Sequence, residues 1–262
     1  GIDNLGANTL YASGSVDVSG TYTTPGNGSI EMGGSGVSLY SAVTLGDLTV
    51  DSAGTVTVVT GALTVGGGLT ILNGELATGS QDLTMGGLTD IDGTLTFSNG
   101  SGTNVLDCNG NVDADGALTI TGSADARFAG ANVDITGGSL SANTSTVTFD
   151  ATATTQSFDL NGSSLHNLTI NNTNGTPTVT AASTVDVLGS LTRTAGDLAM
   201  GGFALSVAGD ITHTAGTLTS SGTVTLDGTG NTQSVDFTGA SLTNFTIDNT
   251  HTTPTVTVDG PI

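Results

Sequence analysis

Four aspartates form the arrangement in this sequence that most resembles a ligand site. LTDIDGTLTF (residues 88–97) and NVDADGALTI (residues 111–120) align without a gap, which places Asp90 level with Asp113 and Asp92 level with Asp115. If the two segments are neighbouring strands, paired carboxylates lie about 4.8 Å apart. They then repel by about 3.5 kcal/mol at an effective dielectric constant of 20, and by less than about 1 kcal/mol in water. A hard cation such as Ca²⁺ would relieve this repulsion.

The spacing matches a calcium loop only at its start. Residues 111–116 read Asn-x-Asp-x-Asp-Gly, but the twelfth position of such a loop falls on Gly122, where a bidentate carboxylate is required. We therefore expect solvated turn carboxylates, with bound Ca²⁺ as the alternative, and no other cofactor.

No catalytic constellation is visible elsewhere. His166, His213 and His251 are scattered, and we expect them to face solvent, with His213 beside Arg193 of the preceding coil. A polysaccharide lyase needs basic residues, and a glycosidase needs paired acids with aromatic platforms. The chain has no Lys and no Trp, and its three Tyr occur within the first 40 residues. We therefore expect no enzymatic activity and keep a polysaccharide-active enzyme as a less favoured alternative.

Charge and composition exclude several partners. The 262 residues include 23 acidic and two basic residues, for a formal net charge of −21, so binding to nucleic acid is disfavoured. No run of about 18 apolar residues exists to form a transmembrane helix. The lone Cys108 excludes an internal disulfide, and we expect it to be a small buried hydrophobic residue.

The chain repeats itself at two scales. Residues 155–180 match residues 232–257 at 17 of 26 positions without a gap, and residues 63–79 resemble residues 185–201. A shorter repeat places Gly-x-aliphatic units at Gly54, Gly74, Gly93, Gly116 and Gly138, roughly 20 residues apart. The longer shifts, of 77 and about 122 residues, would then correspond to about four and six turns.

The recurring Leu-Thr-aliphatic triplets explain the short repeat. In a strand, the flanking apolar residues point to one face and the central Thr points to the other. The sequence therefore predicts an all-β fold, a right-handed parallel β-helix (β-solenoid) with about 20 residues and three short strands per coil and some 13 coils in all. Glycine is expected at the corners, where a positive φ is often required.

The repeat divides the chain unevenly. Residues 1–42 fit it least well and would form irregular first coils, a cap or a docking segment. Residues 43–262 would form the solenoid body, with related modules near 155–231 and 232–262.

The G-x-L and L-T-aliphatic units, with their TINNT and TIDNT connectors, resemble the parallel β-helices of bacterial surface proteins of the filamentous haemagglutinin-like and autotransporter-passenger class. The resemblance is to a style of repeat, and it implies secretion, display at the cell surface, adhesion or fibre building.

Solenoids need polar caps, and neither end shows an amphipathic cap helix. We therefore expect an extracellular structural protein that polymerises head to tail with identical copies, as a filament or sheath subunit. The alternative is a rod-like spacer within a large surface adhesin or autotransporter passenger. An ice-binding protein is less favoured, because the Thr-x-Thr units do not recur on consecutive coils of one wall. Several Asn-x-Ser/Thr sequons would accept glycans.

Overall fold

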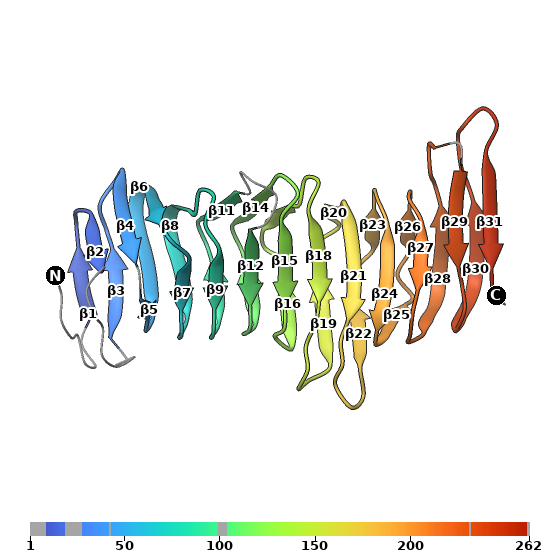
Figure 1. Ribbon diagram of the computed structural model, residues 1–262, viewed down its shortest axis with the longest axis horizontal. Coiled ribbons are helices and arrows are strands. Elements are labelled where there is room, and N and C mark those ends of the chain that lie inside the picture. Colours follow the sequence, from blue (N-terminus) through green and yellow to red (C-terminus); the bar gives the residue numbers. More distant parts are fainter. Residues whose placement is uncertain (1–8, 19–27, 42, 99–103, 231, 261–262) are drawn as a thin grey trace. The chain divides into compact units, whose positions relative to one another are not determined.

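The computed structural model describes residues 9–18, 28–41, 43–98, 104–230 and 232–260, and every regular element within them is a β-strand (Figure 1). The strands form a parallel β-solenoid of about 11 turns over these described residues, with a spacing of about 21 residues per coil. The chain forms two compact units. The N-terminal unit comprises Gly1–Arg127 and Ile135–Ser141, and the C-terminal unit comprises Phe128–Asp134 and Ala142–Ile262.

The strands of the N-terminal unit are short, and most have three to five residues. They are β1 (Thr9–Ala12), β2 (Val16–Val18), β3 (Ser29–Met32), β4 (Val37–Ser41), β5 (Thr44–Leu45), β6 (Leu48–Thr60), β7 (Leu63–Val65), β8 (Leu69–Ala77), β9 (Leu83–Met85), β10 (Thr89–Ile91), β11 (Thr94–Ser98), β12 (Val105–Cys108), β13 (Val112–Ala114), β14 (Ala117–Thr121) and β17 (Ser139–Ser141).

The C-terminal unit is built in the same way, and β15 (Asp125–Phe128) contains residues of both units. Its other strands are β16 (Asn132–Asp134), β18 (Thr146–Phe149), β19 (Gln156–Asp159), β20 (Ser164–Leu165), β21 (Asn167–Asn171), β22 (Thr178–Ala181), β23 (Val185–Val187), β24 (Leu191–Ala195), β25 (Asp197–Gly201), β26 (Leu205–Val207), β27 (Ile211–His213), β28 (Leu218–Leu226), β29 (Thr232–Asp236), β30 (Ala240–Ile247) and β31 (Thr255–Asp259).

Each coil has three walls, as the coil formed by β8 and β9 shows. Leu69–Ile71 of β8 pairs with β10 and forms the first wall, and Glu75–Ala77 of β8 pairs with β11 and forms the second wall. Strand β9 forms the third wall, which belongs to a separate sheet and pairs with β7 and β12. The prediction of three parallel strands per coil is therefore confirmed.

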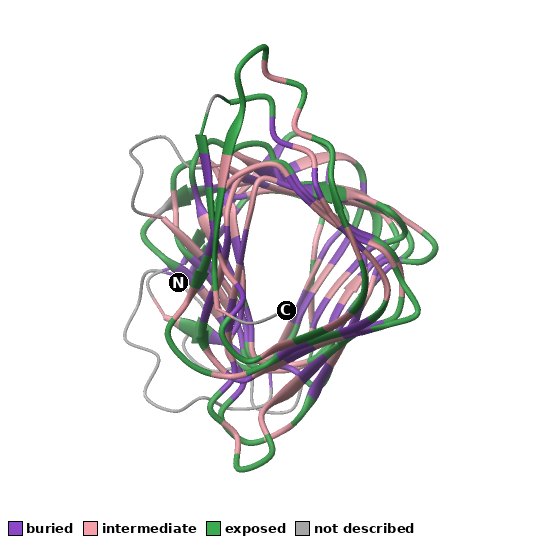
Figure 2. Ribbon diagram, turned by 90° about the vertical axis from the view of Figure 1, so that its right-hand side faces the viewer, coloured by how far each residue is buried: buried purple, intermediate pink, exposed green. Residues whose placement is uncertain are grey.

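The alternation of side chains places the core inside the coil. Leu69 and Ile71 are fully buried, whereas Thr70 between them is half-buried on the outer side. Figure 2 shows buried segments recurring along the strands of the coils, with exposed segments at the corners. Aliphatic residues dominate this core, and a group of phenylalanines joins them: Phe128, Phe149, Phe158 and Phe237 are all fully buried.

Glycine is needed at the stacked corners because coils approach each other closely there. Of the column Gly74, Gly93, Gly116 and Gly138, only Gly74 has a positive φ, of 74°. A Cβ atom on Gly116 would collide with the carbonyl oxygen of Gly93, and one on Gly138 would collide with that of Gly116. The expectation that these corners need positive φ is therefore wrong for three of the four, where the missing Cβ matters instead.

Replacement of Gly116 by Ala tests this explanation. The new Cβ would meet backbone that cannot rotate away, so we expect a loss of about 3 kcal/mol in the free energy of unfolding. The matched control is Gly175→Ala, because a Cβ there meets nothing within 4 Å. That control should change stability by less than about 1 kcal/mol. Equal effects on thermal unfolding would contradict the explanation.

About 13 coils were expected for the whole chain, and the described residues form about 11 turns. The corners vary in length, since Ser157 pairs with Asn132, 25 residues earlier, whereas the expected spacing was about 20 residues. The 77-residue repeat also does not span four whole turns. Gln156 lies on β19 in the first wall, whereas its equivalent Gln233 lies on β29 in the third wall. The repeated module is therefore displaced by three turns and two walls.

The described parts of residues 1–42 belong to the coils. Strand β3 pairs in parallel with the first part of β6, and β4 pairs with its second part. Strands β1 and β2 stack in the same way on β3 and β4.

Candidate functional site

The structure brings the four aspartates to one corner region of the N-terminal unit. Asp90 on β10 pairs in register with Asp113 on β13, as the alignment predicted. Asp90 is half-buried, whereas Asp92, Asp113 and Asp115 are exposed. The pKa of the Asp90 carboxyl is raised, mainly by burial and further by the charges of the other three aspartates.

These carboxylates form a column along the outside of the coils. Among the described residues, no three His, Cys, Asp or Glu side chains converge in a way that would hold a metal ion. The residues present therefore do not supply the cage of oxygen ligands that Ca²⁺ requires. The aspartate column therefore affects stability, and we propose no ligand for it.

Replacement of Asp90 by Asn should stabilise the protein slightly at neutral pH. A carboxyl whose pKa is higher in the folded state destabilises the fold above that pKa, and the penalty disappears as the pH falls through the folded pKa towards the unfolded value. We expect a gain of less than about 1 kcal/mol at pH 7, because solvent screens the repulsion. The gain should vanish below about pH 4. Thermal unfolding across pH measures it, and a gain that grew on acidification would contradict the assignment.

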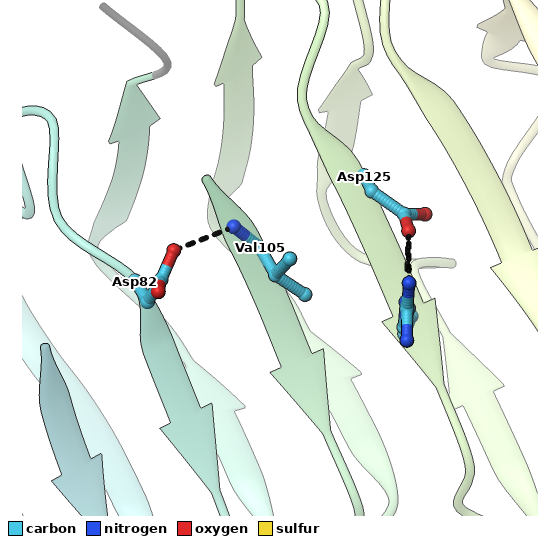
Figure 3. Close-up of polar contacts among 4 residues, drawn as sticks. Asp82, Val105 and Asp125 are labelled. Carbon is cyan, nitrogen blue, oxygen red and sulfur yellow. Dashed lines mark hydrogen bonds and ion pairs between the residues drawn. The ribbon is translucent and has the colours of Figure 1, made fainter. Parts of the chain in front are cut away.

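Other aspartates join consecutive coils. A carboxylate oxygen at a corner accepts a hydrogen bond from a backbone N–H of the following coil, at 2.8–2.9 Å. The pairs are Asp47 with Gly68, Asp82 with Val105, Asp197 with Thr217 and Asp210 with Ser234. Figure 3 shows the Asp82–Val105 contact. Some of the acidic residues therefore stabilise the corners of the solenoid by these hydrogen bonds.

The exposed basic residue Arg127 has a local partner. Its guanidinium contacts the Asp125 carboxylate of the same strand at 2.7 Å (Figure 3). Both side chains are partly exposed, so this ion pair adds little to stability.

Arg193, in contrast, lies inside the core of the C-terminal unit with no exposed surface. Its Nη2 donates to the carbonyl oxygens of Asp236 and Thr238 at 3.2 and 3.1 Å, and its Nη1 lies 3.5 Å from that of Gly216. These carbonyls belong to the next two coils, so one side chain spans three coils. Burial lowers the pKa of the guanidinium, while the charges of Asp236 and Asp197 oppose that shift.

His213 occupies the adjacent inward position. It pairs in register with Arg193, as predicted, and its Nε2 lies 3.0 Å from the carbonyl oxygen of Gly216. The prediction that His213 points outward is wrong, because it alternates with exposed Thr212 and therefore faces the same side as Ile211. His213 and Arg193 together secure the Gly216 corner.

Sequence reasoning missed two buried glutamines. Gln156 Nε2 donates to the carbonyl oxygens of Phe128 and Gly130, and Gln233 Nε2 donates to those of Val207 and Gly209. Both side chains are buried, and each binds carbonyl oxygens of residues that lie 24–28 positions earlier in the chain. Their identity in the two copies of the 77-residue repeat was the available signal.

Outward threonines stack on consecutive coils of the third wall. Thr148, Thr169, Thr192 and Thr212 are register neighbours on β18, β21, β24 and β27. The expectation concerned Thr-x-Thr units, which need two such columns side by side. The flanking outward residue on β21 is Asn167, so the threonines form a single column without a second matching one. Ordinary β-propensity accounts for such a column.

A surface depression in the C-terminal unit is lined by Gly201, Thr219, Ser220, Ser221, Ser241 and Thr243. These side chains include no acid, base or metal ligand suited to proton transfer. Cys108 is buried, and burial raises the pKa of its thiol, which keeps it protonated and unreactive.

The outer edge of the last described coil is open. Among the described residues, β30 pairs only with β28, and β31 pairs only with β29. Inward Ile247 on β30 is 52% exposed, whereas its register neighbour Leu226 is fully buried. Val258 on β31 is 37% exposed, whereas its neighbour Val235 is 1% exposed. Within the described residues, the inward positions of β30 and β31 are therefore less covered than those of the preceding coil.

No protein family matches this sequence, and no curated protein or solved structure is significantly similar to it. In the described residues, no helix is long and apolar enough to cross a membrane. The geometry of the coils and of their open edge is therefore the basis for any functional proposal.

Proposed function

We propose that this protein is an extracellular structural protein, the subunit of a surface filament or sheath that assembles by end-to-end stacking of its solenoids. The observation that supports this proposal is the open edge of β30 and β31. Edge strands with exposed apolar core positions are templates for pairing with another chain, and natural proteins normally block them. Such an edge favours a function in assembly.

The internal repeat strengthens the argument. Strand β30 and the start of β31 carry the same module as β20, β21 and β22, and those strands are covered on their outer side by β23, β24 and β25. The last described coil therefore has the sequence of an interior coil. Sequence of this kind is adapted to having a further coil stacked on it.

A location outside the cell is the part of the proposal that rests on resemblance to bacterial surface β-helices. The high acidity, with 23 acidic and two basic residues, is compatible with that location and argues against a nucleic-acid partner. Outward Asn-x-Ser/Thr sequons would permit glycosylation. We propose no catalytic activity and no cofactor.

The alternative is a spacer within a larger surface adhesin, in which further coils of the same chain cover the edge. The edge geometry suits either occupant, since both add a parallel coil. The mass of the native gene product distinguishes them, because an adhesin would carry this segment within a much longer chain.

Assembly can be tested with a variant of the edge. Replacement of Ile247 by Asp would place a charge at a position that stacking buries, so filaments seen by negative-stain microscopy should disappear. The matched control is Leu188→Asp, because Leu188 is 56% exposed at a corner away from the edge. That variant should still assemble. A wild-type protein that stays monomeric at high concentration in light scattering would overturn the proposal.

A further inference from the structure

We propose that the occupant of the open β30 edge is the first coil of a second copy, with β1 stacked on Ala240–Leu242 and β2 on Asn244–Ile247. This inference rests on the proposed function and specifies which strands of the two copies are in contact. The wall order supports it, because the chain passes through the first and second walls in β30 and reaches the third wall in β31. The next coil must therefore begin with a first-wall strand and a second-wall strand, as β1 and β2 are.

The spacing of inward residues fits this register. On β28, which covers β30 from the other side, the inward residues are Leu218, Ser220, Val224 and Leu226. On β1 and β2, the inward residues are Leu10, Ala12, Val16 and Val18, with identical separations. A coil with the spacing of β28 can therefore lie on each side of β30.

The side chains brought together are complementary. Small Ala240 would face Leu10 of the second copy, and Leu242 would face Ala12. Phe245 and Ile247 would face Val16 and Val18, which continues the apolar columns that contain Val224 and Leu226. Equivalent atoms would lie about 4.8 Å apart, as in the other coils.

The outward residues avoid a clash of charges. Asp17 of the second copy would lie beside Thr246, whose hydroxyl can donate to the carboxylate. The same contact exists within the chain, where Ser164 Oγ donates to Asp186 Oδ2 at 2.6 Å on adjacent coils. This matters because two chains of net charge −21 repel each other, and added salt should therefore promote stacking.

The first coil also has the sequence of an interior coil. Residues 9–20 match residues 178–189 at six of twelve positions, including the Val-Asp-Val of β2 and β23. Strand β23 pairs with another strand along each of its two edges, with β20 and with β26. Among the described residues, β2 pairs along one edge only, with β4.

Disulfide trapping tests the register. Thr246→Cys and Asp17→Cys are made as separate variants and mixed under mild oxidation, so that only contact between copies can join them. The proposed register places these two Cα atoms within the range a disulfide spans. The expected result is a shift from monomer to disulfide-linked dimer on a non-reducing gel, with the joined peptides identified by mass spectrometry. Each variant alone should remain monomeric on the gel, and buried Cys108 should not react.

A second pair reports the alternative register. Ser241→Cys mixed with Asp17→Cys would be linked if the copies stacked one wall out of step, as Ser164 and Asp186 pair within the chain. Linkage of this pair, or filaments without linkage of Thr246→Cys to Asp17→Cys, would overturn the inference while leaving assembly intact. Absence of any association would overturn the proposed function as well.

Discussion

Replacement of Arg193 by alanine is expected to lower the free energy of unfolding by about 3–5 kcal/mol. The guanidinium donates to carbonyl oxygens of Asp236 and Thr238 and approaches that of Gly216, and the side chain has no exposed surface. Removing it leaves the carbonyl oxygens of Asp236 and Thr238 without this donor and opens a cavity in the core. Thermal and urea unfolding measure the change, and if the two units unfold separately, only the transition of the C-terminal unit should shift.

The matched control is Arg127→Ala. Arg127 is the other basic residue, and its ion pair with Asp125 is exposed to solvent. This variant should cost less than about 1 kcal/mol. If the two arginine variants lost similar stability, the assignment of Arg193 as the link between three coils would be wrong.

Phe149→Ala is expected to cost about 3–5 kcal/mol. The Phe149 ring stacks on Phe158 with centroids 4.6 Å apart and contacts Phe128 with centroids 5.8 Å apart. All three rings are fully buried on different coils, so their truncation removes contacts between coils as well as within one. Denaturant unfolding of the C-terminal unit gives the measurement.

Phe203→Ala provides the comparison for Phe149. Phe203 is 39% exposed at a corner, so its truncation should cost less than about 1 kcal/mol. A small effect of Phe149→Ala would mean that neighbouring side chains collapse into the space.

The large effects expected inside the coil explain why its open edge favours assembly. In the interior of the C-terminal unit, each apolar ladder position is covered by the next coil, as Leu226 is by β30. At the edge, Ile247 and Val258 have the same inward orientation without such cover. Stacking of one further coil would bury both residues and pair the free backbone, and each buried aliphatic side chain contributes about 1.5–3 kcal/mol. The proposed junction therefore uses the same interactions that hold the coils together.

The sequence determined the class of fold because its signal is local and repeated. Leu-Thr-Val triplets alternate inward and outward with the period of a strand, and the recurrence near 20 residues gave three strands per coil. The level placement of Asp90 with Asp113, and of Arg193 with His213, followed from the same periodicity. Burial of Cys108 followed from its residue type.

Only the tertiary structure decided the features that depend on how far each corner extends. The variable corners moved the 77-residue repeat to a different wall, so that Gln156 and Gln233 occupy different sheets. Stacking showed that Gly116 is needed for its missing Cβ, and it placed Arg193 and His213 on the inner side. A period in the sequence specifies which residues are equivalent, but contacts between coils depend on the backbone path, which corner length sets one coil at a time.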